Sequence, residues 1–219
     1  MKRLIVIGIF LLCTGAIFAQ NGVIKELSGT VELKRAGTAN FVPAKVGDKI
    51  AKDTIVSTGF KSSALITVGS AVITVRPLTR LTLAEISASA GQETLNVALQ
   101  AGRVRVDVEP PAGTKTNVSV QGPSATASVR GTSFECDTEA VTVLKGVVAY
   151  QGKAGGPMLV SAGSTSEVMA NGRAADPIDT NAAELTFPPY AGNNTGFHHN
   201  SIPDVRGDFE FGIGQMTMH

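Results

Sequence analysis

Apolar and polar residues alternate in short runs along most of the chain, and the runs are separated by Gly, Pro and polar turns. A period of two is typical of half-buried β-strands. The runs recur about every ten residues between residues 22 and 170, which predicts an all-β sandwich, barrel or short β-solenoid-like wrap. Clear examples are Val31/Leu33, Val72/Ile73/Val75, Leu95/Val97/Leu99, Val104/Val106/Val108 and Val141/Val143. No segment has apolar residues at helical spacing over a useful length. We expect residues 84–92 to form one turn or a loose loop.

The segment Pro123–Cys136 contains a change in this alternation. Small apolar residues at alternate positions up to Val129 share one face of a predicted strand, and apolar residues resume at Phe134 and Cys136 with the opposite parity. A regular strand cannot switch faces without an extra residue or a turn. We therefore predict a bulge or sharp bend at Gly131-Thr132, with both sets of apolar residues facing the core.

The same segment resembles the signature of the FecR domain, an exported all-β domain of bacteria. The family pattern reads roughly Pro-x-Ala-x-Ala-x-Val-Arg-Gly-Thr-x-Phe, and the matching residues here are Pro123, Ala125, Ala127, Val129, Arg130, Gly131, Thr132 and Phe134. Further landmarks follow in the family's order: Gly47 and Asp48, Gly69 and Ser70 (with Val68 in place of the usual Asp), Gly102, and Gly146. The resemblance covers about residues 22–170. It implies a single FecR-type domain in which we expect these residues to have a structural role.

The N-terminus has the three parts of a secretory signal peptide. Lys2 and Arg3 are basic, residues 4–12 form an apolar run too short to span a bilayer, and small residues follow. We predict cleavage after Ala19, a periplasmic or secreted protein, and no transmembrane helix in the mature chain. Removal of Lys2 and Arg3 leaves 17 basic residues against 18 acidic ones. This net charge of −1 gives no electrostatic reason to expect nucleic acid as a partner.

Composition divides the chain into a signal peptide (1–19), a FecR-like all-β domain (20–175) and a polar, mostly irregular tail (176–219) that contains aromatic residues. In the tail, Phe209, Phe211 and Ile213 alternate with Glu210 and Gly212, which predicts a short strand. A strand of this size is not stable alone. We expect it to pair with an edge of the protein's own sheet, or to serve as an interaction tail that pairs with a partner.

The sequence offers little material for catalysis. All three histidines lie in the tail, at positions 198, 199 and 219, so no Ser-His or Cys-His pair is available inside the domain. Cys136 remains alone after export and is expected to be a buried, inert thiol. Arg130 is expected to pin the bend by binding backbone carbonyls or a nearby acid, with a ligand carboxylate or phosphate as the alternative. We predict no enzymatic activity, no metal and no cofactor.

The resemblance also suggests a function. In the best-known FecR proteins, the domain is the periplasmic part of a single-span regulator, which receives a signal from an outer-membrane transporter and controls a sigma factor. We expect this protein to lack the cytoplasmic N-terminal region, the membrane anchor and the transporter-contact domain of those regulators. We therefore expect a stand-alone, non-catalytic interaction module of the cell envelope, whose partner is another envelope protein or a cell-wall component. Two alternatives remain: a structural or surface-associated protein that binds cell-wall glycan, and a hydrolase whose carboxylates are assembled by folding.

Overall fold

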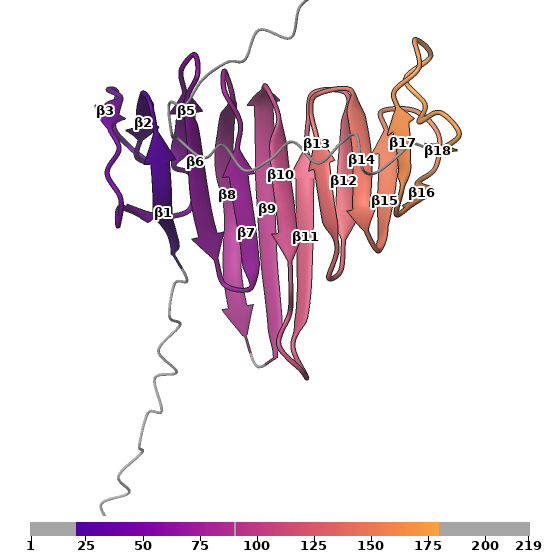
Figure 1. Ribbon diagram of the computed structural model, residues 1–219, viewed down its shortest axis with the longest axis horizontal. Helices are drawn as coiled ribbons and strands as arrows, with labels where there is room; N and C mark the ends of the chain where they lie inside the picture. Colours follow the sequence, from indigo (N-terminus) through magenta and orange to yellow (C-terminus); the bar gives the residue numbers. More distant parts are fainter. Residues whose placement is uncertain (1–20, 90, 180–219) are drawn as a thin grey trace, which may run out of the picture. The chain divides into compact units, whose positions relative to one another are not determined.

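The computed structural model describes residues 21–89 and 91–179, and all regular structure within these ranges is β-strand. The strands form two nine-stranded sheets (Figure 1). In spatial order, sheet A contains β18 (Ile178–Asp179), β17 (Ser164–Glu167), β14 (Ala140–Lys145), β13 (Ser133–Cys136), β10 (Val104–Val108), β7 (Ala71–Val75), β6 (Ser63–Val68), β1 (Gly22–Ser28) and β4 (Lys49–Ile50). Sheet B contains β16 (Met158–Ser161), β15 (Val147–Gly152), β12 (Ala125–Val129), β11 (Lys115–Gln121), β9 (Gln92–Ala101), β8 (Arg80–Ser89), β5 (Ile55–Thr58), β2 (Val31–Lys34) and β3 (Val42–Pro43). The predicted all-β fold is confirmed. In the described ranges no helix is long and apolar enough to cross a bilayer.

The chain adds strands to the two sheets in turn, so that the sequence advances along both sheets together (Figure 1). Hairpins β6–β7 and β13–β14 belong to sheet A, and hairpins β8–β9, β11–β12 and β15–β16 belong to sheet B. Within the described residues β9–β11 is the one parallel pair. It is parallel because the chain passes through β10 in sheet A before it returns to sheet B. The result combines the facing sheets of a sandwich with the wrapping path of a short solenoid.

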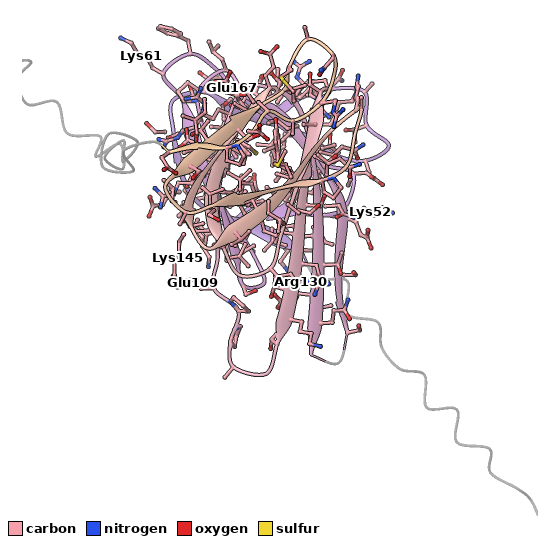
Figure 2. The ribbon with its side chains drawn as sticks, turned by 90° about the vertical axis from the view of Figure 1, so that its right-hand side faces the viewer. Lys52, Lys61, Glu109, Arg130, Lys145 and Glu167 are labelled. Atoms are coloured by element: carbon pink, nitrogen blue, oxygen red, sulfur yellow. The ribbon has the colours of Figure 1, made fainter. Side chains whose placement is uncertain are left out.

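The core lies between the two sheets, because alternate residues of each strand point inward. Strands β7 and β10 illustrate this, with every second residue buried. The core is mostly aliphatic; its largest fully buried side chains include Phe134, Ile24, Leu33, Ile50, Ile66, Ile73, Leu81, Leu83 and Leu99. Figure 2, viewed from the β16–β18 end, shows the two sheets enclosing side chains, while Lys52, Lys61 and Glu109 point outward.

The predicted change of face after Val129 is confirmed. β12 ends at Val129 in sheet B, and β13 begins at Ser133 in sheet A. The intervening residues carry the chain from one sheet to the other, and Gly131 adopts a left-handed backbone with φ +70°. Val129, Phe134 and Cys136 are all buried. The parity of the apolar residues therefore reverses because the inward direction reverses when the strand changes sheet.

The loop or turn expected at residues 84–92 is wrong. β8 continues to Ser89, and β9 begins at Gln92, so the two strands form a long hairpin that pairs as far as Ser89 and Gln92. The pairing register shifts between Leu83 and Glu85. This irregularity interrupts the apolar alternation, and the outer half of β8 is largely exposed. The segment is held by pairing to β9 rather than by burial, which explains why its sequence lacks a strand pattern.

The described structure extends slightly beyond the domain end predicted at residue 175, because β18 pairs with β17 as far as Asp179. The predicted signal peptide, and the tail strand with Phe209, Phe211 and Ile213, lie outside the described residues.

Candidate functional site

The early turn at Gly47-Asp48 closes one end of sheet A. The Asp48 carboxylate accepts a hydrogen bond from the Lys45 backbone N–H at 2.9 Å. The Asp48 carbonyl accepts one from the Ile24 N–H at 3.0 Å, and the Gly47 N–H donates to the Ile24 carbonyl at 2.8 Å. The first bond closes the turn on itself, and the two bonds with Ile24 fasten it to β1. The geometry gives both residues a structural task.

The second turn, Gly69-Ser70, joins β6 to β7 and connects the two sheets. Glu93 of β9 accepts hydrogen bonds from the Ser70 backbone N–H at 3.1 Å and from the Ser70 hydroxyl at 2.6 Å. The same carboxylate oxygen accepts a bond from the Thr116 hydroxyl of β11 at 3.1 Å. One carboxylate thus ties a sheet A hairpin to two strands of sheet B.

The two remaining glycine landmarks lie where backbone segments approach closely. Gly102 (φ +84°) packs against Thr79, and Gly146 (φ +85°) packs against Thr132. A Cβ at position 146 would lie 2.7 Å from Thr132 Cγ2. Thr132 itself is buried, and its carbonyl accepts a hydrogen bond from the Val108 N–H at 2.9 Å. These residues therefore hold the crossings between the sheets.

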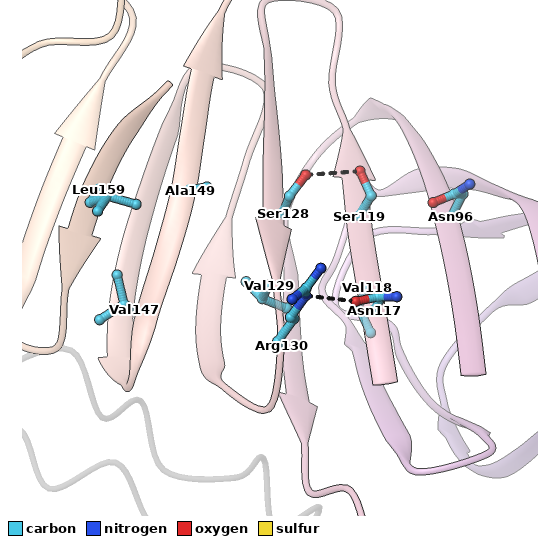
Figure 3. Close-up of a pocket in the computed structure, with 10 residues that line it drawn as sticks. All are labelled: Asn96, Asn117, Val118, Ser119, Ser128, Val129, Arg130, Val147, Ala149 and Leu159. Carbon is cyan, nitrogen blue, oxygen red and sulfur yellow. Dashed lines mark hydrogen bonds between the residues drawn. The ribbon is translucent and has the colours of Figure 1, made fainter. Parts of the chain in front are cut away.

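Arg130 differs from the other landmark residues because its side chain lies on the outer face of sheet B. Its Nε donates a hydrogen bond to Asn117 Oδ1 on β11 at 2.9 Å (Figure 3). The expected bond to a backbone carbonyl or to an acid is not the contact that forms. This bond uses Nε and leaves the terminal nitrogens of the guanidinium outside it, and both Arg130 and Asn117 line a groove on the same face.

This groove has a volume of about 410 Å³ and crosses five strands of sheet B, from β9 to β16. It is lined by Asn96, Asn117, Val118, Ser119, Ser128, Val129, Arg130, Val147, Ala149 and Leu159. The strand register aligns Asn96, Ser119, Ser128, Ala149 and Leu159 in one transverse row. Figure 3 shows the row, with the small Ser119, Ser128 and Ala149 between larger neighbours. These short side chains leave the surface hollow.

The groove is polar at one end and apolar at the other. Asn96, Asn117 and the hydroxyls of Ser119 and Ser128, which lie 3.4 Å apart, offer neutral hydrogen-bonding groups. Val147 and Leu159 at the other end are 47% and 68% exposed. Arg130 is the one charged residue among the ten that line the groove. This surface can bind an anionic or carbonyl group beside an apolar side chain, and its lining includes no carboxylate, imidazole or thiol for catalysis.

Acidic residues gather instead on the outer face of sheet A, where arginines pair with them. Arg76 lies 3.1 Å from Glu135, and Arg103 lies 3.0 Å from Asp137 and 3.7 Å from Glu135. Burial alone would raise the pKa of the Asp137 carboxyl, but the N–H groups of Glu139 and Ala140 and the Arg103 guanidinium lower it below its usual value. A general acid needs a raised pKa. The ion-paired cluster therefore gives the hydrolase alternative no support.

Cys136 faces the core beside this cluster and is buried. Burial raises the pKa of its thiol, and the nearby carboxylates of Asp137 and Glu135 raise it further. The thiol stays protonated at neutral pH, which agrees with the expected inert residue. In the parts of the chain that the structure describes, no three His, Cys, Asp or Glu side chains come together as metal ligands.

The structure thus separates the predicted landmark residues into two groups. Glycines, Asp48, Ser70 and Thr132 hold turns and crossings, whereas Val129 and Arg130 line the groove. The other polar residues of the groove were missed by sequence reasoning. Their one signal in the sequence is the alternation of Asn117, Ser119, Ser128 and Arg130 with buried valines, which any outward strand face would show.

Comparison with known proteins gives a family match to the central part of the chain. The family model described as FecR protein matches residues 54–149. Two crystal structures of a candidate anti-sigma factor from Parabacteroides distasonis, at 1.65 and 2.50 Å resolution, match with a TM-score of 0.48 and 17% sequence identity. The match covers 60% of this chain and 62% of that chain, which is less than two thirds of its length. No curated protein matches the sequence.

Proposed function

We propose, from the match of residues 54–149 to the FecR family model, that the protein is a non-catalytic interaction module of the bacterial cell envelope. The groove on sheet B is the observation that carries the proposal. It joins exposed apolar side chains, neutral hydrogen-bonding groups and a single arginine on one face, a combination found at protein-binding surfaces. A role of the module in signalling rests on the family resemblance alone.

The partner that best suits this surface is another envelope protein. Arg130 offers terminal N–H donors to a carboxylate or a main-chain carbonyl. Val147, Ala149 and Leu159 offer a shallow apolar contact to a neighbouring side chain. A polypeptide provides both kinds of group at the short spacing that the groove requires. The described residues contain no feature that favours cell-wall glycan over protein.

We further propose that the protein is exported and that its mature chain begins at Gln20. The basic residues, the short apolar run and Ala19 support this cleavage site. The intact mass of the protein recovered from the exported fraction should correspond to residues 20–219. A mass that retains residues 1–19, or a lipid attached to Cys13, would contradict the proposal.

Site-specific photo-crosslinking in the native envelope tests the groove as the binding surface. A photoreactive residue in place of Ala149, at the centre of the groove, should give a discrete adduct whose partner mass spectrometry identifies. The same residue in place of Thr74, on the outer face of sheet A, should give none. Arg130→Glu should reduce the yield of the Ala149 adduct by about fivefold or more, because it replaces the donor with a like charge for an anionic group.

Lys52→Glu is the matched charge reversal, because Lys52 is exposed and is not among the residues that line the groove. It should leave the Ala149 adduct unchanged. Equal labelling from positions 149 and 74, or equal loss of the adduct in both charge-reversal variants, would show that the groove is not a specific binding surface.

A further inference from the structure

The two sheets end in four edge strands that differ in how they are protected. β3, β4 and β18 have two residues each, and they contain Pro43, Lys49 and Asp179, respectively. Short length, proline and charge are the features by which proteins block pairing at sheet edges. β16 has four residues, Met158–Ser161, without proline or charge. Among the described strands, β16 is therefore the one unblocked edge.

The register of β16 shows which of its backbone groups are available. Val148 is paired with Val160, and Ala149 with Leu159. The Ala162 N–H donates to the Gly146 carbonyl at 2.9 Å, which fixes the bonded pairs of this antiparallel ladder at every second residue. Val160 therefore bonds to β15, whereas the N–H and C=O groups of Leu159 and Ser161 point away from it. β15 is the one strand partner of β16 in the described structure.

The side chains of this edge continue the apolar end of the groove. Leu159 is 68% exposed and lies in the same transverse row as Ala149, while Val160 on the opposite face is fully buried. Val147 of the neighbouring strand is 47% exposed. A residue paired with Leu159 on an added strand would place its side chain on the outer face, in contact with Leu159. An apolar residue at that position would extend the Val147–Leu159 contact.

We propose that β16 accepts an extended segment of a partner protein as an added strand of sheet B, and that this segment is uncharged with apolar side chains at alternate positions. The proposal rests on the proposed function and specifies its mode of binding. Two outward-facing residues suit a single strand, whereas a stable homodimer needs roughly 1,000 Å² of total buried area, which a four-residue edge does not provide. The absence of charge from β16 favours an uncharged segment, and backbone hydrogen bonds would supply the directionality of binding.

Amide hydrogen exchange of the full mature chain, followed by NMR, tests the proposal directly. The probe is a blocked synthetic peptide, acetyl-KTVTLTVTK-amide, whose uncharged central segment TVTLTVT has apolar residues at alternate positions and whose terminal lysines serve only to keep it in solution. Saturating peptide should slow exchange at the Leu159 and Ser161 amides by at least about tenfold, and it should leave the Val160 amide, already bonded to β15, little changed. A peptide of the same composition with its apolar residues adjacent should have a much weaker effect.

Two matched substitutions separate binding from folding. Leu159→Lys places a charge on the open edge and should abolish the protection, while Val42→Lys makes the same change on β3 and should preserve it. Both positions are exposed, at 68% and 45%, so both variants should melt close to the unmodified protein. Leu159→Pro should also abolish binding without unfolding, because the N–H that it removes points away from β15.

Three other outcomes of the exchange experiment would overturn the proposal, and each points to a different explanation. No protection by the alternating peptide means that β16 does not accept a strand. Slow exchange at Leu159 and Ser161 in the free monomer means that residues of this same chain already cover the edge. Protection that rises with protein concentration assigns the edge to a second copy. The proposed function is tested separately, by the crosslink from position 149. If that crosslink does not form, the proposed function fails, whereas the protection of β16 by the peptide is measured independently of it.

Discussion

Replacing Phe134 by alanine should lower the free energy of unfolding by about 3–5 kcal/mol. Phe134 is the largest of the fully buried side chains in the described core. It lies on β13 between Val106 of β10 and Val143 of β14, with which it is paired in sheet A. The surrounding side chains are branched aliphatics on paired strands, so they can move only slightly to fill the space that the ring leaves.

Urea denaturation measures this effect as a fall in the midpoint concentration at an unchanged slope. Phe60→Ala is the matched control, because Phe60 is 73% exposed in the loop between β5 and β6. That control should change stability by no more than about 0.5 kcal/mol. Similar midpoints for the two variants would contradict the assignment of Phe134 to the centre of the core.

The alternation of apolar residues was sufficient to predict the fold class, because inward and outward positions leave a direct trace in sequence. The segment around Gly131 shows how far this goes. Two apolar sets of opposite parity predicted a bend, and the structure places Val129 and Phe134 on different sheets.

The pattern could not predict which strands pair with each other in the sheets. The parallel pairing of β9 with β11 depends on the path through β10, and no local signal encodes it.

The groove could not be predicted for the same reason. Asn96, Ser128 and Leu159 are far apart in sequence, and they form one row only because the registers of four strand pairs coincide. Arg130 was singled out by its place in the family signature, but its partner was not foreseen. Asn117 lies on the adjacent strand, where the Val118–Val129 pairing sets it opposite Arg130. A side-chain contact across a strand pair requires the register, which sequence alone does not supply.

The failure at residues 84–92 has a different physical origin. Residues 87–89 of β8 are exposed on both faces, so they leave no apolar alternation to detect, and Ser, Ala and Gly then suggest a turn. Backbone pairing between β8 and β9 nevertheless holds the segment as a long hairpin. Sequence patterns report burial, so structure that depends on hydrogen bonds between strands is the part most easily missed.

Gly102→Ala is the second substitution for which we expect a large loss, of about 3 kcal/mol or more, for two additive reasons. Gly102 has φ +84°, a conformation that costs an L-residue about 1–2 kcal/mol. In addition, a Cβ at this position would lie 2.5 Å from Thr79 Cα and 2.7 Å from the Leu78 carbonyl oxygen. Both are backbone atoms of a crossing segment, and relieving such overlap typically costs a further 1–3 kcal/mol, roughly.

The surrounding hydrogen bonds leave Thr79 little freedom to move away from an added Cβ. Its hydroxyl accepts a bond from the Arg103 N–H at 3.0 Å, and its own N–H donates to the Thr58 hydroxyl at 3.0 Å. Thr58 and Thr79 are both buried, so breaking these bonds would leave unsatisfied polar groups. The turn between β9 and β10 is thereby fixed against the segment that precedes β8.

Gly37→Ala provides the control that separates the two costs. Gly37 has a similar left-handed backbone, with φ +74°, but an added Cβ there would have no neighbour within 4 Å. This variant should lose only the conformational part, about 1–2 kcal/mol. Urea denaturation of the two variants, at an unchanged slope, gives the free energy of unfolding of each. The additional loss in Gly102→Ala is the cost of the close approach to Thr79. If the midpoints coincide, the close contact between Gly102 and Thr79 contributes nothing, and the left-handed backbone alone would explain why glycine occupies position 102.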